Sequence, residues 1–187
     1  MKCSVFIATS LDGFIAKLDG NVDWLHTAGN GKELPPDQAD MGLNAFMSSV
    51  DCMIMGRKTM EIISNMNLSP EQWFYRDIKI IVLSNTLKEA PENLKNKVEL
   101  YSGELNNLIY KLEHEGYQYA YIDGGKTIQE FMNLKLINEI TITNAPVLLG
   151  EGIPLFGKFT SEIKLEKAQA ITFPNDFVQV NYQVKYV

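Results

Sequence analysis

Four short segments of this 187-residue chain place glycine, hydroxyl or charged residues directly after an apolar run. The first apolar run, Val5-Phe6-Ile7, leads into Ala8-Thr9-Ser10-Leu11-Asp12-Gly13. The other three segments follow the apolar runs 52–55, 79–83 and 119–122, and they read Gly56-Arg57-Lys58-Thr59, Ser84-Asn85-Thr86 and Asp123-Gly124-Gly125-Lys126-Thr127. Ligands of open α/β sheets bind outside the carboxyl ends of the strands, so the four segments predict one shared binding site.

The residue types in these segments favour a phosphate-bearing ligand. Arg57 can pair with a phosphate through two N–H groups and Lys58 adds a point charge, both at a predicted helix N-terminus. The paired glycines Gly124 and Gly125 let a ligand approach the backbone closely. Each segment taken alone is also explained as an ordinary turn. Neither G-x-G-x-x-G nor G-x-x-x-x-G-K-[ST] occurs, so a dinucleotide would be held by other means.

The elements that must position these segments alternate along the chain. Short continuous apolar runs at 4–8, 52–55, 79–83, 98–101 and 119–122 predict strands buried on both faces, and a further β-rich run lies at 139–143; together with the helices between the strands they indicate a mostly parallel sheet. Helical patterns lie at 36–49, 58–63, 104–115 and 127–134. The runs 164–171 and 177–187 predict a closing antiparallel hairpin. We therefore expect one α/β domain over residues 1–187, a three-layer α/β/α fold with a mixed, mostly parallel sheet. The long loop 25–36 is either a lid or a plain surface excursion.

Composition excludes several classes of protein. The chain is 45% hydrophobic and 21% charged, as in ordinary globular domains, and its net charge of −6 argues against general affinity for nucleic acid or an anionic membrane. No apolar run approaches the roughly 18 residues of a membrane span, and no signal-peptide pattern precedes the first strand. Two cysteines and two distant histidines make no disulfide framework or metal site. We expect a cytoplasmic, metal-free protein that acts on a small molecule.

The order of these motifs resembles the dihydrofolate reductase-like superfamily over essentially the whole chain. The closer resemblance is to the C-terminal reductase domain of the bifunctional riboflavin-biosynthesis deaminase–reductase, and the segments 136–140 and 146–156 look like further signatures of that group. The resemblance implies a 5-amino-6-(5-phosphoribosylamino)uracil reductase-like activity, with NADPH as hydride donor and commonly a homodimer. The two cations Arg57 and Lys58 suit the extra phosphate of NADPH.

The resemblance also implies roles for individual residues on the cofactor side. Ala8 and Ile15 would lie against the nicotinamide, and Leu83 and Ser84 would line the adenine ribose site. The pyrophosphate and the adenosine 2′-phosphate would be held by Gly56, Arg57, Lys58 and Thr59. The pyrophosphate would also be wrapped by Gly124, Gly125, Lys126, Thr127 and Ile128, with an unusual peptide between the two glycines.

On the substrate side the resemblance is weaker. Asp40 matches the helix carboxylate that binds the pterin in dihydrofolate reductases, although Asp37 competes for that position and both fit first-turn acids favoured by the helix dipole. Trp24 resembles a loop tryptophan over the nicotinamide site, although it fits an exposed loop aromatic or a core anchor equally well. Phe46 is a further candidate on the substrate side. Asp12 and Asp40 are the candidate catalytic acids, because hydride addition to C=N needs a proton. Asp12 is equally explained as a residue that caps its own turn.

The chain also departs from the riboflavin enzyme. Residues 39–50 contain no basic side chain, so the expected partner of a ribose phosphate is missing, and no H-x-E or P-C-x-x-C deaminase motif is present. Three hypotheses follow: a reductase of the riboflavin-pathway kind acting on a heterocyclic or carbonyl/imine substrate, a dihydrofolate reductase-type pterin reductase, and a nucleotide-binding protein without turnover.

Overall fold

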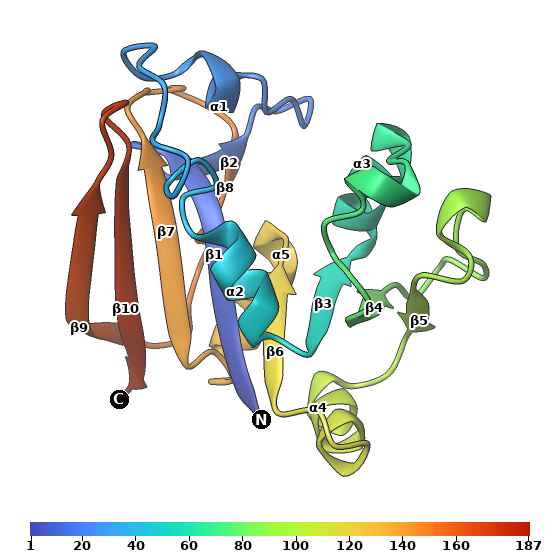
Figure 1. The fold of residues 1–187 in the computed structure, drawn as a ribbon. Helices are drawn as coiled ribbons and strands as arrows, with labels where there is room; N and C mark the ends of the chain where they lie inside the picture. The colour runs from blue at the N-terminus through green and yellow to red at the C-terminus, as the bar shows by residue number, and fades with distance from the viewer.

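The computed structural model describes residues 1–187, and its centre is an eight-stranded sheet in the order β5-β4-β3-β6-β1-β7-β10-β9 (Figure 1). The strands from β5 to β7 pair in parallel, and β10 and β9 add to this sheet antiparallel. Their bounds are β1 Lys2–Ser10, β3 Cys52–Gly56, β4 Lys79–Leu83, β5 Glu99–Tyr101, β6 Tyr119–Asp123, β7 Glu139–Ala145, β9 Ile163–Thr172 and β10 Val178–Tyr186. The predicted fold class is confirmed, including the C-terminal hairpin.

Helices cover both faces of the sheet and divide the core into two main layers. On one face α2 (Leu43–Ser49) and α3 (Arg57–Met66) pack on alternate residues of β3 and β4, such as Met53 and Val82. On the other face α4 (Leu105–His114) and α5 (Gly125–Asn133) pack on the intervening residues, such as Ile54. This alternation follows from the period of two in a strand. A helical turn α1 (Trp24–Thr27), two 3-10 turns, η1 (Pro70–Gln72) and η2 (Glu92–Leu94), and a separate pair of short strands, β2 (Phe14–Ala16) and β8 (Ile153–Pro154), complete the fold.

The helix predicted at 36–49 was placed wrongly at its start. The helix begins only at Leu43, because Met41 and Gly42 have φ angles of 50° and 88°, which cannot continue a right-handed helix. The Asp40 carboxylate instead accepts the backbone N–H groups of Gly42 and Asn44, at 3.0 and 2.7 Å. Asp40 therefore lies before the helix and satisfies free N–H groups of its first turn.

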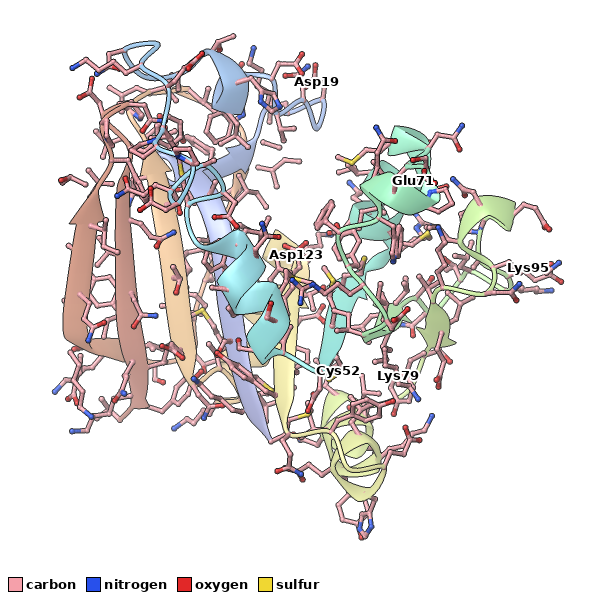
Figure 2. All side chains as sticks on the ribbon, in the orientation of Figure 1. Asp19, Cys52, Glu71, Lys79, Lys95 and Asp123 are labelled. Carbon is pink, nitrogen blue, oxygen red and sulfur yellow. The ribbon has the colours of Figure 1, made fainter.

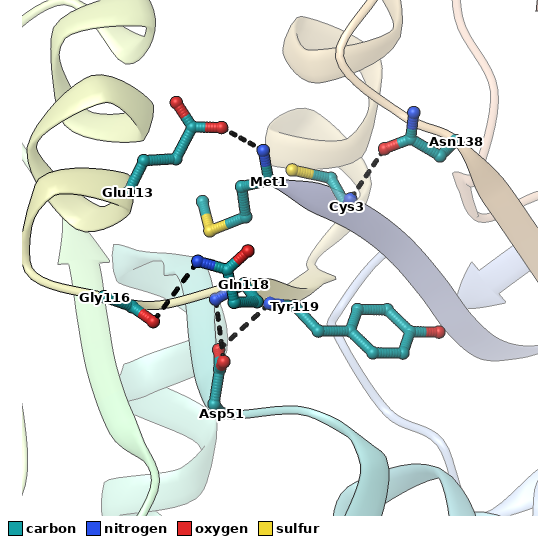
Figure 3. Close-up of polar contacts among 8 residues, drawn as sticks. All are labelled: Met1, Cys3, Asp51, Glu113, Gly116, Gln118, Tyr119 and Asn138. Carbon is teal, nitrogen blue, oxygen red and sulfur yellow. Dashed lines mark hydrogen bonds and ion pairs between the residues drawn. The ribbon is translucent and has the colours of Figure 1, made fainter.

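Polar contacts hold together the end of the sheet opposite to the four predicted segments (Figure 3). The Asp51 carboxylate accepts the backbone N–H groups of Gln118 and Tyr119, at 2.7 and 3.1 Å, and so joins the starts of β3 and β6. The side-chain oxygen of Asn138 accepts the N–H of Cys3 at 2.7 Å, which joins the starts of β1 and β7. These contacts fix the strands where they begin and leave their carboxyl ends to the loops that form the site.

Candidate active site

The four predicted segments lie along one edge of the sheet. They follow β4, β3, β6 and β1, which are consecutive neighbours in the strand order and pair in parallel. The prediction that these segments share an edge is therefore confirmed. The edge was predictable because continuous apolar runs identify parallel strands, whose carboxyl ends lie together.

The segments after β3 and β6 approach each other more closely than side chains would allow. A Cβ atom added to Gly124 would lie 2.5 Å from Thr59 Oγ1, and one added to Gly56 would lie 3.0 Å from Thr127 Oγ1. Gly124 also has φ 90° and ψ 129°, a conformation that favours glycine. The peptide bond between Gly124 and Gly125, which was expected to be unusual, is trans like the others of the chain. The backbone angles of Gly124 make the turn.

This contact brings the N-termini of α3 and α5 together. Their free N–H groups carry partial positive charge, and the exposed side chains of Lys58 and Lys126 stand beside them. Arg57 is also exposed; its guanidinium pairs with Glu61 and donates to Thr86 Oγ1, both at 3.2 Å. Arg57 thus connects the turn after β3 to the turn after β4. The arrangement can hold an anion through backbone and side-chain donors.

The residues predicted to face the nicotinamide and the ribose lie on either side of these helix ends. A Cβ atom on Gly125 would lie 3.0 Å from Ile15 Cδ1, so β2 lies over the start of α5. Ala8 lines a cavity on the other side, described below. Leu83 and Ser84 line a separate cavity of about 510 Å³ between the ends of β4 and β5 and the helix α5. Of the predicted cofactor residues, Leu83 and Ser84 thus line one cavity and Ala8 lines the other.

The cavity beside Ala8 has a volume of about 540 Å³. Its floor is the sheet, through Phe6 of β1, Tyr121 of β6 and the buried Thr143 of β7. Its cover comes from the loop before α2, including His26 and Lys32, and from the turn between β9 and β10. Of the two interpretations of the loop 25–36, its position over this cavity favours the lid.

The three predicted substrate-side residues occupy different places. Asp40 lines the cavity, and its hydrogen bonds from Asn44 and Gly42 lower the pKa of its carboxyl. Trp24 is buried against Ala145, Phe173 and Phe177 and anchors the lid. Phe46 stacks on Phe6 with ring centres 4.9 Å apart and therefore supports the floor of the cavity from α2. Neither Trp24 nor Phe46 lines the cavity.

Asp12 has a clear structural role. It accepts the hydroxyl of Ser10 at 2.6 Å and the backbone N–H groups of Leu149 and Gly150 at 3.2 and 2.8 Å. The hydrogen bond from Ser10, followed by the two backbone donors, lowers the pKa of this exposed carboxyl. Asp12 therefore connects the turn after β1 to the segment 146–156 as a carboxylate. Its proposed catalytic role stays a prediction.

Asp123 is the acidic residue that sequence reasoning did not single out as catalytic. It ends β6 in the middle of the molecule, opposite Met55 of β3 (Figure 2). The residue is only partly covered, but burial of its carboxyl raises the pKa to about 6, against the lowering effects of the Gly124 N–H at 2.8 Å and of the Tyr121 hydroxyl. The sequence signal for a catalytic role was an acidic residue at the end of a buried strand and before two glycines. An ordinary turn explains the same pattern equally well.

Comparison with known proteins agrees with this architecture. Residues 2–179 match the model of the RibD C-terminal domain. The uncharacterized protein YwjB of Bacillus subtilis (strain 168) is 33% identical over 183 residues, which are 97% of each chain. The structure of a candidate riboflavin biosynthesis protein from Shewanella sp. PV-4 is 38% identical, with a TM-score of 0.88 over 100% of both chains. Acinetobacter baumannii RibD shares the fold, with a TM-score of 0.72, 17% identity, and coverage of 98% of this chain and 58% of that one.

The fold, and the four segments at the carboxyl edge of its sheet, define a protein of the RibD reductase-like class. The chain belongs to the RibD C-terminal domain family. None of the helices has the length and apolar character that crossing a membrane requires.

The contact at Gly124 gives a direct test of the site geometry. Gly124→Ala should weaken the binding of an anionic ligand such as pyrophosphate at least tenfold, because its methyl group displaces Thr59 and the two helix N-termini with it. Gly116→Ala is the matched control, since Gly116 has a φ of 95° but no atom within 4 Å of the added Cβ. Both variants should lose about 1 kcal/mol of unfolding free energy from backbone strain, measured by urea denaturation. Only Gly124→Ala should lose binding in a calorimetric titration, and adding Thr59→Ala should restore part of it.

Proposed function

We propose that this protein is an NADPH-dependent reductase that transfers hydride to a small heterocyclic or carbonyl/imine substrate. The observation that carries the proposal is the close approach of two helix N-termini, flanked in sequence by Arg57, Lys58 and Lys126, at the edge of a sheet whose strands β1 and β6 also line a cavity of about 540 Å³. Family membership supports the same reaction class. When bound, NADPH would supply the hydride, and the protein would supply position, electrostatics and a proton.

The residues at the carboxyl edge of the sheet fit NADPH. The N-termini of α3 and α5 would receive the pyrophosphate, because the close packing of Gly56 on Thr127 and of Gly124 on Thr59 brings these two helix ends together. Arg57, with Lys58 beside it, would pair with the 2′-phosphate close to Ser84 and Thr86, which lie in the neighbouring turn. Ile15 and Ala8 would face the nicotinamide, at the border of the cavity where the substrate would bind.

Asp123 is the acidic group whose pKa best suits it to supply the proton. Addition of hydride to C=N or C=O leaves negative charge on the acceptor, which a nearby acid must neutralise. Asp12 and Asp40 are held as carboxylates by several donors, whereas burial favours the protonated form of Asp123. Asp123 also follows Tyr121, a wall of the cavity, at a spacing of two residues along β6, so both face the same side of the sheet.

A pterin is the second candidate substrate. Asp40 lines the same cavity as Ala8, and an anionic carboxylate there can accept N–H groups from the edge of a heterocycle. A substrate with a ribose phosphate would need a cation, and within this cavity the lid supplies Lys32 and His26, although α2 supplies none. Steady-state oxidation of NADPH, measured with pterin and with pyrimidine substrates, shows which of these two substrate classes the protein reduces.

We also propose a homodimer. β9 is the outermost strand and is exposed along nearly its whole length, with Leu165 and Ile171 exposed by 40% and 53%. Free strand edges and exposed apolar side chains are typical of interaction surfaces. The segment around Leu148, which is 69% exposed, is the other candidate contact. Light scattering should give twice the mass of the chain, and Leu165→Glu should reduce it to one chain if β9 forms the contact.

The cofactor assignment is tested by titration with NADPH and NADH. We expect NADPH to bind more tightly, and Arg57→Gln to weaken NADPH binding on the order of tenfold, which corresponds to about 1.4 kcal/mol, with little effect on NADH. Lys95→Gln, which changes an exposed lysine far from this edge, should alter neither affinity. If neither nucleotide binds more tightly than about 1 mM, or about −4 kcal/mol, the cofactor assignment is wrong. Tight binding of NADPH without turnover on any substrate would instead support a binding protein.

The role of Asp123 predicts a specific pH dependence. A general acid with a pKa of about 6 is protonated below that pH, so kcat/KM should fall as the pH rises through 6. Asp123→Asn should lower kcat/KM about 100-fold and remove this fall. The raised pKa also means that the folded protein binds a proton more tightly than the unfolded chain. As the pH rises from about 4 to about 6, the unfolding free energy of the wild type should therefore fall relative to that of Asp123→Asn. Calorimetry can measure this difference without any substrate.

A further inference from the structure

The buried hydroxyl of Thr143 lies at the floor of the cavity beside Ala8 and accepts a hydrogen bond from the neighbouring strand. Thr143 pairs across the sheet with Ala8 of β1 on one side and with Gln179 of β10 on the other, and the residue is only 4% exposed. Its Oγ1 atom accepts a hydrogen bond from Gln179 Nε2 at 2.8 Å. Among the hydrogen bonds of the chain, none uses the Thr143 hydroxyl as the donor.

A second partner fixes the direction of the Gln179 hydrogen bond. The same Nε2 atom donates to the backbone carbonyl of Met41 at 2.9 Å. A carbonyl can only accept, so the NH2 group of Gln179, and not its amide oxygen, must face Met41. The NH2 group has two protons, and Met41 and Thr143 receive one each. Thr143 is therefore an acceptor toward β10 and keeps its own proton for another partner.

The cavity is where this proton can find an acceptor. Thr143 lines the cavity, and so do Met41 and the preceding residue, Asp40. A ligand that displaces water from a buried hydroxyl must offer an acceptor atom, because a donor left unpaired is costly. The Asp40 carboxylate can only accept, so it requires an N–H group from the same ligand. The cavity thus presents one hydrogen-bond donor and one acceptor to a ligand.

We propose that Thr143 donates a hydrogen bond to a carbonyl oxygen of the substrate, and that Gln179 is a positioning residue that keeps the Thr143 proton directed into the cavity. A planar heterocycle in which a carbonyl stands next to an N–H satisfies Thr143 and Asp40 together. The position suits this role, because the paired residue Ala8 faces the nicotinamide in the proposed function. The inference rests on that function in taking the ligand to be the substrate of the reductase.

The next cross-strand pair has the same arrangement away from the cavity. Asn181 Nδ2 donates to Thr141 Oγ1 at 2.8 Å and to the Glu139 carboxylate at 2.9 Å. Both amide–hydroxyl pairs join β10 to β7, and such pairs contribute to the stability of a sheet. Thr141, however, does not line the cavity. Thr141 is therefore the matched control, since its hydroxyl makes the same cross-strand contact and cannot reach a ligand.

The test compares two small probes that differ at the group facing Thr143. 4-Pyrimidinone has a ring carbonyl beside an N–H, and 4-aminopyrimidine has an amino donor in place of that carbonyl. Their affinities are measured without cofactor, from the NMR shifts of 15N-labelled protein. We expect Thr143→Val to lower the affinity for pyrimidinone relative to aminopyrimidine about fivefold, the size of one net hydrogen bond. Thr143→Ser, which keeps the hydroxyl, and Thr141→Val should both retain the wild-type ratio.

Gln179→Glu tests the positioning role. It replaces the NH2 group by a carboxylate oxygen, which would accept the Thr143 proton and so withdraw it from the cavity. We expect the affinity ratio to fall as in Thr143→Val, with no further fall when the two changes are combined. A wild-type ratio in Gln179→Glu would overturn the role of Gln179. Thermal unfolding checks that each variant is folded, and Thr143→Ala replaces Thr143→Val if that variant is not.

The outcomes separate this inference from the proposed function. A wild-type ratio in Thr143→Val, or binding of neither probe, would overturn the inference. A protein that prefers pyrimidinone through Thr143 but oxidises no NADPH with any substrate would uphold it and reject the reductase. Conversely, an active reductase whose probe ratio is unchanged in Thr143→Val would uphold the proposed function and reject the role of Thr143.

Discussion

The close approach of the β3–α3 and β6–α5 turns is the constraint on which the rest of the site depends. Neighbouring parallel strands bring the two turns together, and only residues without side chains at positions 56 and 124 allow the backbones to meet against Thr59 and Thr127. The two helix N-termini then point at one region. Without this contact, each helix end would be an isolated partial charge, worth only about 0.3–1 kcal/mol toward an anion at an exposed position.

The same parallel arrangement separates the structural end of the sheet from the functional end. Where the strands begin, Asp51 and Asn138 satisfy backbone N–H groups of their neighbours and fix the strand register. Where they end, β1 and β6 stop pairing at Ser4 and Tyr121, and the polar atoms beyond that point have to find other partners. Unpaired buried polar groups are costly, so side chains such as that of Tyr121 supply those partners. The gap between the two strands thus produces both the floor of the cavity and the setting of Asp123.

Much of this could be predicted from the sequence, and the parts that could not share one cause. Continuous apolar runs followed by small polar residues were enough to place four turns on one edge, because this depends only on local patterns and on parallel pairing. The start of α2 was missed because it depends on the positive φ of Met41 and on the carboxylate of Asp40, neither of which has a periodic signature. Trp24 and Phe46 were expected at the ligand, but both pack against residues that are distant in the chain. Trp24 packs against Phe173, and Phe46 stacks on Phe6. Tertiary packing decided these positions.

The three aspartates of the site show the same principle at the level of chemistry. All three lie in or next to turns. From residue type alone, Asp12 and Asp40 were candidates for the catalytic acid at least as strong as Asp123. In the fold, Asp12 receives one hydroxyl and two backbone N–H groups and Asp40 receives two backbone N–H groups, so both are stabilised as anions. Asp123 receives the N–H of Gly124 and lies beside two buried phenols, and burial outweighs the lowering effect of Gly124 and of the Tyr121 hydroxyl on its pKa. The number and direction of the donors around a carboxyl, which only the folded chain determines, decide whether that carboxyl binds an ion, caps a turn or delivers a proton.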